Sequence, residues 1–387
     1  MRPSPLDLWE FARYANNLAR TASASAVGAQ PLGRSRASMC RTVLQPKGCA
    51  PAGSVGRVPA IALLTLTAWI WLWPLDTALG QGWGHWGSCP GGGDTGIVYT
   101  EPPNEVPVNA DSVRTAREIA SHSTDTPDWT NEPGFERDVF SFVRIIYRRA
   151  PDGSGISITS SPLGWITDFP DSDLNLSYRL QQVTSMKVNP DGRVLRLTDP
   201  ALFDYPWIYM VEPGGLQLKA EEVPILRKYL LNGGVLMADD FWGQKQWDNF
   251  ERNIRRVLPE YRFTELPMDH PIFHCVFDIK VPKNKLQTPN IRQGIRSLNP
   301  NSWEYGITWE RYHDDYNNHD RQGRDAHDMH VRAMLDEKQR ILVIATHNCD
   351  NGDGWEREGE DDGFFHEFSE KRAYPLGINI IFYLMTH

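Results

Sequence analysis

The sequence predicts an α/β protein, a three-layer sandwich in which helices cover both faces of a mostly parallel central sheet. Short apolar, β-branched runs alternate with amphipathic helical segments between residues 139 and 257. Successive runs are separated by enough chain for a crossing helix, and such strand, helix, strand units place their strands parallel. An apolar helical segment closes the chain at 373–385, where we expect it to cover the sheet.

The individual elements follow from local patterns. A strand is predicted where β-branched and aromatic residues follow one another without a breaker. A helix is predicted where apolar residues recur every three or four positions, as at Leu176, Leu180 and Val183. Gly233 is predicted to end one helix with a left-handed backbone. The predicted elements are strand 139–147, helix 171–183, strands 194–197 and 206–211, helix 221–231, strand 235–238, helix 245–257, a segment 269–278 that begins as a turn and ends strand-like, a hairpin of 330–335 with 340–347, and helix 373–385.

Charge and composition divide the chain into three parts. With 40 Lys and Arg residues against 49 Asp and Glu, the formal charge is -9, and no long basic block occurs, so no nucleic-acid partner is expected. Residues 1–80 are predicted to be an N-terminal extension with a signal peptide, and 81–135 a linker rich in Gly, Pro and polar residues. Residues 136–387 are predicted to be one α/β domain with a polar insertion at about 303–329.

An uncharged apolar run at 58–75 follows a basic N-terminal region and precedes small residues at 78–80. These are the three parts of a secretory signal peptide. We therefore expect export to the periplasm or cell envelope, with cleavage near Gly80. The alternative is that the run stays uncleaved as an N-terminal membrane anchor, because it approaches the length of about 20 residues that crosses a bilayer.

Two adjacent carboxylates, Asp239 and Asp240, follow the predicted strand 235–238. Ligands of open parallel α/β sheets collect beyond the carboxyl ends of central strands. His347 ends another predicted central strand, so an aspartate and His347 could form a pair that orients water or holds a divalent ion. The alternative is that these side chains are hydrogen-bonded structural groups. Other residues expected around the same crevice are Asp168, His270, Asn348, Asp350, Asp353 and Trp355.

No cofactor is predicted, and a divalent metal ion is the one group that the crevice acids could hold. The chain has neither a Walker A loop nor a GxGxxG turn that opens a helix. Residues 350–354 alternate oxygen-bearing side chains with glycine, as calcium loops do, but the closing glutamate of an EF-hand is missing. A loop rich in turns is the alternative interpretation of this segment.

Several sequence blocks resemble one known family. They are DFPDSDLNLSYRLQQ (168–182), YLLNGGVLMADDFWG (229–243), NFERNIRRVLP (249–259), DHPIFH (269–274), HNCDNGDGWE (347–356) and AYPLGINIIFYLMTH (373–387). Together they are similar to the exported bacterial family named domain of unknown function 4159, over about 139–387. The resemblance implies a class I glutamine amidotransferase-like, flavodoxin-like fold. It also implies cell-envelope partners of the MoxR ATPase and von Willebrand factor A-domain type.

The amidotransferase relatives carry a nucleophilic cysteine at a strand-to-helix turn. Here that turn holds Asp-Asp-Phe at 239–241, and Cys275 and Cys349 lie elsewhere, so glutaminase chemistry is not expected. The first hypothesis is a non-catalytic module of the cell envelope that binds a protein partner or a small ligand. The second is a metal-assisted hydrolase that uses the crevice carboxylates and His347.

Overall fold

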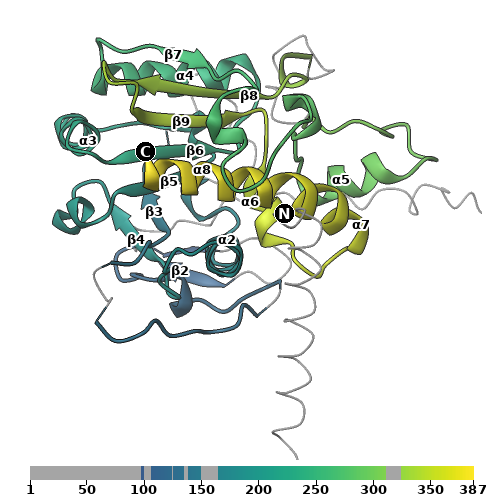
Figure 1. The fold of residues 1–387 in the computed structure, drawn as a ribbon, viewed down its shortest axis with the longest axis horizontal. Helices are drawn as coiled ribbons and strands as arrows, with labels where there is room; N and C mark the ends of the chain where they lie inside the picture. The colour runs from purple at the N-terminus through teal and green to yellow at the C-terminus, as the bar shows by residue number, and fades with distance from the viewer. Residues whose placement is uncertain (1–96, 100–105, 124, 135–137, 150–163, 311–323) are drawn as a thin grey trace, which may run out of the picture. The chain divides into compact units, whose positions relative to one another are not determined.

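The computed structural model describes residues 97–99, 106–123, 125–134, 138–149, 164–310 and 324–387 (Figure 1). The predicted signal peptide, its apolar run at 58–75 and the cleavage site near Gly80 lie outside these residues, as do 311–323 of the polar insertion. Within the described ranges, no helix combines the length and the apolar character that crossing a bilayer requires.

The domain is organised around one seven-stranded sheet. Its strands are β3 (Val143–Ile146), β4 (Arg193–Arg196), β5 (Trp207–Val211), β6 (Val235–Asp239), β7 (Phe263–Glu265), β8 (His330–Leu335) and β9 (Ile341–His347). In space they follow the order β4-β3-β5-β6-β9-β8-β7. The first five in this order are parallel, and β8 and β7 are antiparallel additions at one edge. The predicted α/β class with a mostly parallel sheet is therefore confirmed.

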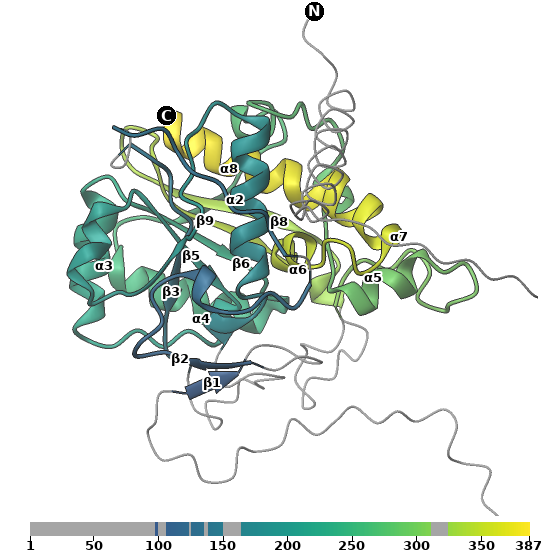
Figure 2. The ribbon, with the colours of Figure 1, turned by 90° about the horizontal axis from the view of Figure 1, so that it is seen from below.

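Helices cover both faces of this sheet, as Figures 1 and 2 show together. The main helices are α2 (Asp171–Val183) and α8 (Tyr374–Thr386) on one face, and α3 (Glu222–Leu231) and α4 (Gly243–Val257) on the other. Side chains of β5 alternate between the two layers, because successive residues of a strand point to opposite faces. Tyr209 packs in the core layer of α2 and α8, and Met210 packs in the layer of α3 and α4.

The four main helices confirm the predictions made from the periodicity of apolar residues, since their ends lie within about two residues of the predicted ends. Gly233 follows α3 with φ +111°, which confirms the left-handed end of this helix. Shorter elements were not predicted, because they lack a repeated apolar pattern. They are the strand β7, the helices α5 (Ile291–Leu298), α6 (Asn351–Glu356) and α7 (Asp362–Phe364), and the π-helix η8 (Phe365–Ala373).

The strand expected at the end of 269–278 does not form. Pro271–Phe273 make a short 3-10 helix, η5, and the N–H groups of Val276 and Phe277 donate to Asn379 Oδ1 of α8 at 3.1 and 2.8 Å. Asn379 Nδ2 donates in return to the Phe277 carbonyl at 2.8 Å. A helix side chain therefore satisfies backbone groups that a neighbouring strand would otherwise have paired.

Part of the predicted linker is attached to the domain. We call residues 116–123 and 125–131 the strap; they follow the small antiparallel pair β1 (Ile97–Tyr99) and β2 (Pro107–Asn109). Arg117 Nε donates to the Pro190 carbonyl at 3.1 Å, and Trp129 Nε1 donates to the Val188 carbonyl at 2.8 Å. The strap is thus bound to the segment that leads into β4.

Arg144 of β3 fastens the start of α2 to the sheet. Its guanidinium is fully buried, and Nη2 lies 2.5 Å from Asp173 Oδ1. Nη1 donates to the carbonyls of Trp165 and Thr167 at 2.9 and 2.7 Å. These bonds hold the loop that carries Asp168, so a buried ion pair positions one of the predicted crevice residues.

Arg144→Ala is expected to lower the free energy of unfolding by about 3–5 kcal/mol, because it leaves the buried Asp173 carboxylate without its cation. Guanidinium unfolding at neutral pH measures the change. The matched control is Arg196→Ala, which removes the exposed pair with Asp111 and is expected to cost less than about 1 kcal/mol. Equal losses in the two variants would contradict the role assigned to Arg144.

Candidate functional site

The carboxyl ends of β5, β6 and β9 meet at one edge of the sheet. The three strands are parallel neighbours, and Asp239 at the end of β6 is in register with Val211 of β5 and Thr346 of β9. The two acids predicted from the sequence therefore lie in the middle of this edge, where α/β proteins bind ligands.

The Asp239 carboxylate is fully buried and binds donors from three elements. Its Oδ2 accepts hydrogen bonds from Tyr209 Oη at 3.2 Å, Asn351 N at 3.0 Å and Gly352 N at 3.1 Å. Its Oδ1 accepts from Asn351 Nδ2 at 2.8 Å and from Thr346 Oγ1. Burial raises the pKa of Asp239 to about 6, against the opposing effect of its hydrogen bonds. Asp239 thus ties β5, β9 and the start of α6 to β6.

Left-handed backbone gathers at this edge. Among the described non-glycine residues, φ is positive at Asp168 (62°), Glu212 (47°), Asp240 (54°) and Asn348 (59°), and also at Gln339 (65°) in the β8–β9 hairpin. Glu212, Asp240 and Asn348 directly follow β5, β6 and β9. Such backbone costs a non-glycine residue about 1 kcal/mol or more, and it persists where surrounding contacts impose it.

Three buried carboxylates converge beyond these strand ends. One oxygen each from Asp168, Asp240 and Asp350 lie within 4.8 Å of one another, and the residues are 1, 5 and 4 % exposed. We call these three residues the carboxylate cluster. Trp242 Nε1 donates to Asp240 Oδ1 at 2.9 Å, and the Asp353 N–H donates to Asp350 Oδ1 at 2.8 Å. The cluster joins the loop before α2, the end of β6 and the loop after β9.

Burial and like charge act together on the cluster. Burial raises the pKa of Asp240 well above its usual range, and the nearby carboxylate of Glu310 adds to the rise. Burial also raises the pKa of Asp350, with Asp240 as the next cause. Both groups therefore favour a proton or a cation over an uncompensated charge.

Gly352 allows the cluster to close. A Cβ atom at this position would lie 1.9 Å from Asp168 Oδ2, far inside van der Waals contact. Glycine is therefore required for the Asp168 carboxylate to approach the first turn of α6.

Neighbouring buried acids have an arginine as partner. The pairs are Arg357 Nε with Asp353 Oδ1 (3.0 Å) and Glu356 Oε2 (2.6 Å), and Arg149 Nη1 with Glu212 Oε2 (2.9 Å). In the part of the chain that the structure describes, no Lys, Arg or His side chain forms an ion pair with Asp240 or Asp350. These two carboxylates are thus close to each other without an ion pair of their own, and the nearest basic influence on Asp240 is Arg149, which is bound to Glu212.

His347 lies apart from the carboxylates, although β6 and β9 are neighbours as the prediction requires. Its Nε2 is 3.0 Å from the Gly243 carbonyl, and its Nδ1 is 3.5 Å from Arg332 Nη1. The ring packs against Phe241 and Trp247, on the side of α4. Burial lowers the pKa of His347 to about 3, so the ring is neutral at ordinary pH. Within the described ranges its ring forms no hydrogen bond or ion pair with Asp239 or Asp240.

The other predicted residues divide between two places. Asn348 accepts from Gly243 N at 2.8 Å, and Trp355 is fully buried against Tyr209, so both lie at the carboxyl edge. His270 lies elsewhere, where its Nδ1 accepts from Ile272 N at 3.2 Å and its ring packs against Tyr383 of α8.

Among the described residues, no thiol at this edge is prepared for nucleophilic attack. Cys349 is fully buried, and burial raises the pKa of its thiol well above the usual range. Thr288 N donates to its Sγ at 3.4 Å. A nucleophilic cysteine needs the opposite environment, one that lowers its pKa and admits a substrate.

A family model described as domain of unknown function, DUF4159, matches residues 157–385, which is more than half of the chain. The chain belongs to the DUF4159 family. No curated protein matches the chain. The matched DUF4159 region contains the whole carboxylate cluster, but it begins after β3, which lies between β4 and β5 in the sheet. Arg144 and the strap therefore precede the DUF4159 match and still support its fold.

Sequence analysis missed Glu212 and Glu310 near the cluster, and it missed the arginine partners. Glu212 could have been predicted from the sequence, because it directly follows the apolar strand β5 and precedes Pro-Gly-Gly. Asp240 likewise directly follows β6. Glu310 could not have been predicted from the sequence, because it lies far from any predicted strand end and is brought near Asp240 only by the fold.

The raised pKa of Asp239 predicts a fall in stability with increasing pH. Between the usual carboxyl pKa near 4 and the folded value of about 6, the folded chain keeps a proton that the unfolded chain has released. This group therefore reduces the free energy of unfolding by about 3 kcal/mol over that interval. Asp239→Asn cannot ionise, so its stability should fall less between pH 4 and 7, as denaturant unfolding across that range will measure. Identical slopes for the variant and the wild type would show that Asp239 does not titrate in this way.

Proposed function

We propose that this chain is a non-catalytic binding module of the cell envelope whose carboxylate cluster takes a cationic ligand, most simply a divalent metal ion. The observation that carries the proposal is the charge balance at the carboxyl edge. Neighbouring buried acids form ion pairs with an arginine, whereas Asp240 and Asp350 form none among the described residues, and Arg149, which acts on Asp240 from a distance, is bound to Glu212. Buried carboxylates this close repel each other unless a proton or a cation compensates them.

The donor set favours a hard cation. Carboxylate oxygens are the ligands that Ca²⁺, Mg²⁺ and Mn²⁺ prefer. One ion can approach all three members of the cluster, because three oxygens that are at most 4.8 Å apart always have a point within about 2.8 Å of each, close to the usual Ca–O distances. Glu310, whose charge raises the pKa of Asp240, supplies a further carboxylate nearby.

The non-catalytic part of the proposal rests on how the remaining reactive groups are engaged. The Asp239 carboxylate accepts hydrogen bonds from β5, β9 and α6. His347 is held between the Gly243 carbonyl and Arg332. The Cys349 thiol is buried with a raised pKa. Each of these groups would have to give up its contacts before it could act on a substrate.

The finer fold assignment and the setting belong to the same proposal. The family resemblance and the strand-to-helix turn at Asp240 support a class I glutamine amidotransferase-like, flavodoxin-like fold. The apolar run at 58–75 supports export to the periplasm or cell envelope, with an uncleaved membrane anchor as the alternative. Partners would be envelope proteins of the MoxR ATPase and von Willebrand factor A-domain type, and the acidic balance argues against nucleic acid.

A metal-assisted hydrolase is the second candidate, and one observation favours it. Asp240 has φ +54° directly between β6 and α4, which is the strained strand-to-helix position that carries the nucleophile in many α/β hydrolases. Under this candidate a bound cation would lower the pKa of water and the cluster carboxylates would orient it. The histidine expected for this reaction is not beside the carboxylates, so the chemistry would depend on the cluster alone.

Millimolar Ca²⁺, Mg²⁺ or Mn²⁺ is expected to raise the melting temperature of the full chain at pH 7.5, since a ligand at a hundred times its Kd stabilises by about 2.7 kcal/mol. Asp240→Asn should lose this increase. Gly352→Ala should lose it as well without removing a carboxylate, because the new Cβ displaces Asp168. The matched control is Asp278→Asn, an exposed acid with the same charge change. Calorimetric titration gives the stoichiometry, and the absence of binding by all three ions would overturn the proposal.

The same preparations separate the two candidate functions. The metal-loaded chain is assayed against a carboxylic ester, a phosphate ester and a peptide. A binding module releases no product from any of them. Turnover that requires the metal and disappears in Asp240→Asn would favour the hydrolase instead.

A further inference from the structure

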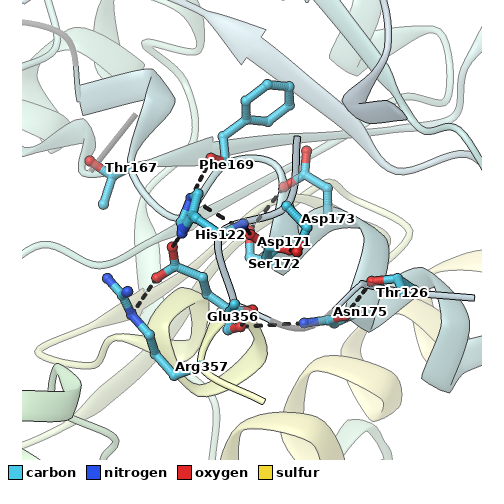
Figure 3. A network of polar contacts seen from close by, with 12 residues as sticks. His122, Thr126, Thr167, Phe169, Asp171, Ser172, Asp173, Asn175, Glu356 and Arg357 are labelled. Atoms are coloured by element: carbon cyan, nitrogen blue, oxygen red, sulfur yellow. Dashed lines mark hydrogen bonds and ion pairs between the residues drawn. The ribbon is translucent and has the colours of Figure 1, made fainter. Parts of the chain in front are cut away.

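The strap bridges two helices that border the carboxyl edge, α2 and α6 (Figure 3). Ser121 Oγ and His122 N both donate to the Asp171 carboxylate in the first turn of α2, the latter at 3.0 Å. Ser123 Oγ donates to the Glu356 carbonyl at the end of α6 at 2.5 Å. Three consecutive residues of the strap therefore connect helices that are far apart in the sequence.

A second link lies one turn further along α2, as Figure 3 also shows. The buried Thr126 Oγ1 donates to Asn175 Oδ1, and Asn175 Nδ2 donates to the Trp355 carbonyl of α6 at 2.9 Å. An amide oxygen that accepts from the strap leaves the amide nitrogen to face α6. Thr126 thus orients the side chain through which α2 binds α6 directly.

Asp168 lies just before α2, and the chain on each side of it is held by a different part of the molecule. Arg144 Nη1 of β3 donates to the Thr167 carbonyl at 2.7 Å. The His122 ring, with its proton on Nε2, donates to the Phe169 carbonyl at 3.1 Å. The backbone of Asp168 has φ +62°, which persists where surrounding contacts impose it. The sheet and the strap therefore hold Asp168 together.

The α6 side of the carboxylate cluster is fixed separately. The N–H groups of Asn351 and Gly352 donate to Asp239 Oδ2, so the start of α6 is bound to β6. A Cβ atom on Gly352 would lie 1.9 Å from Asp168 Oδ2, so the two sides approach closely. The separation of Asp168 from Asp350 therefore depends on how closely α2 is held to α6.

We propose that strap residues 121–123 and Thr126 position Asp168 for the carboxylate cluster. They hold α2 against α6, and so they keep Asp168 within reach of a cation at the other two carboxylates. This inference rests on the proposed cation-binding function. It assigns the regulation of that site to the strap, which precedes the DUF4159 match.

Thermodynamic linkage makes the relation between strap and cation reciprocal. If the bound strap raises the affinity of the cluster for a cation, the bound cation strengthens the attachment of the strap by the same factor. Coupling between two sites commonly changes affinity by about 5-fold to 150-fold. An interaction that lifts the strap from α2 and α6 would therefore weaken cation binding.

Terbium luminescence on the full chain tests the positioning role. Tb³⁺ takes oxygen ligands as Ca²⁺ does, and the Trp242 indole, whose Nε1 lies 2.9 Å from Asp240 Oδ1, transfers excitation to an ion in the cluster. The double variant Ser121→Ala/Ser123→Ala is expected to weaken Tb³⁺ binding by about tenfold. Emission lifetimes in H₂O and D₂O should also show an additional bound water, because water replaces a carboxylate that has moved away.

Matched variants separate positioning from a general loss of stability. Ser112→Ala, which removes a hydroxyl that donates to the Asn109 carbonyl at 3.5 Å, should leave affinity and lifetimes unchanged. Thr126→Val removes the strap hydroxyl at similar volume and should weaken Tb³⁺ binding, whereas Thr126→Ser keeps the donor and should retain it. A lower melting temperature with unchanged affinity and water count would show a structural role only and would overturn the proposal.

Hydrogen exchange supplies the reciprocal measurement. Saturating Ca²⁺ should raise the protection of peptides from residues 116–131 in the wild type but not in Asp240→Asn. If the wild type binds neither Tb³⁺ nor Ca²⁺, the proposed function fails and this inference fails with it. If the wild type binds both and the double serine variant binds them equally well, only the positioning role is wrong. The Thr126 pair decides the question if the double variant does not fold.

Discussion

The buried carboxylate of Asp239 is the constraint on which the carboxyl edge depends. It joins Tyr209 of β5, Thr346 of β9 and the first N–H groups of α6 to the end of β6. Because an ionisable carboxyl group that accepts this many hydrogen bonds holds its donors in place, Asp239 fixes the relative positions of β5, β6, β9 and α6. Once Asp239 is held in this way, the next residues on β6 and β9 have little freedom, and Asp240 and Asp350 are brought close together.

The acids around this joint are compensated in two different ways. Some acids have a cation from the chain itself, as Arg357 is for Asp353 and Glu356. Asp240 and Asp350 of the carboxylate cluster form no ion pair with a basic side chain among the described residues, and burial raises the pKa of Asp240 instead. The acids that have an arginine partner form structural ion pairs, whereas Asp240 and Asp350, which form none, are suited to an external cation.

The strap and the carboxylate cluster share their supports. Asp168 of the cluster and Asp171, which binds the strap, are three residues apart at the start of α2. Asp350 and Glu356 likewise stand at the two ends of α6. A movement of residues 168–171 or of α6 would therefore displace both the attachment of the strap and the carboxylate cluster. The fold thus brings the N-terminal strap into the same polar network as the edge of the sheet, although the family match begins only at residue 157.

The sequence by itself determined the α/β class and the main helices. It also determined that acidic residues follow the central strand β6 and that the strand-to-helix turn there has no cysteine. These are local properties, because periodicity and residue type at a strand end depend only on nearby residues. The tertiary structure alone decided which acids meet and which have partners. His347 follows the neighbouring strand yet packs against Phe241 and Trp247, while Glu310 arrives from a distant loop. The physical reason is that side-chain direction and charge compensation are set by contacts between distant segments, which no local pattern contains.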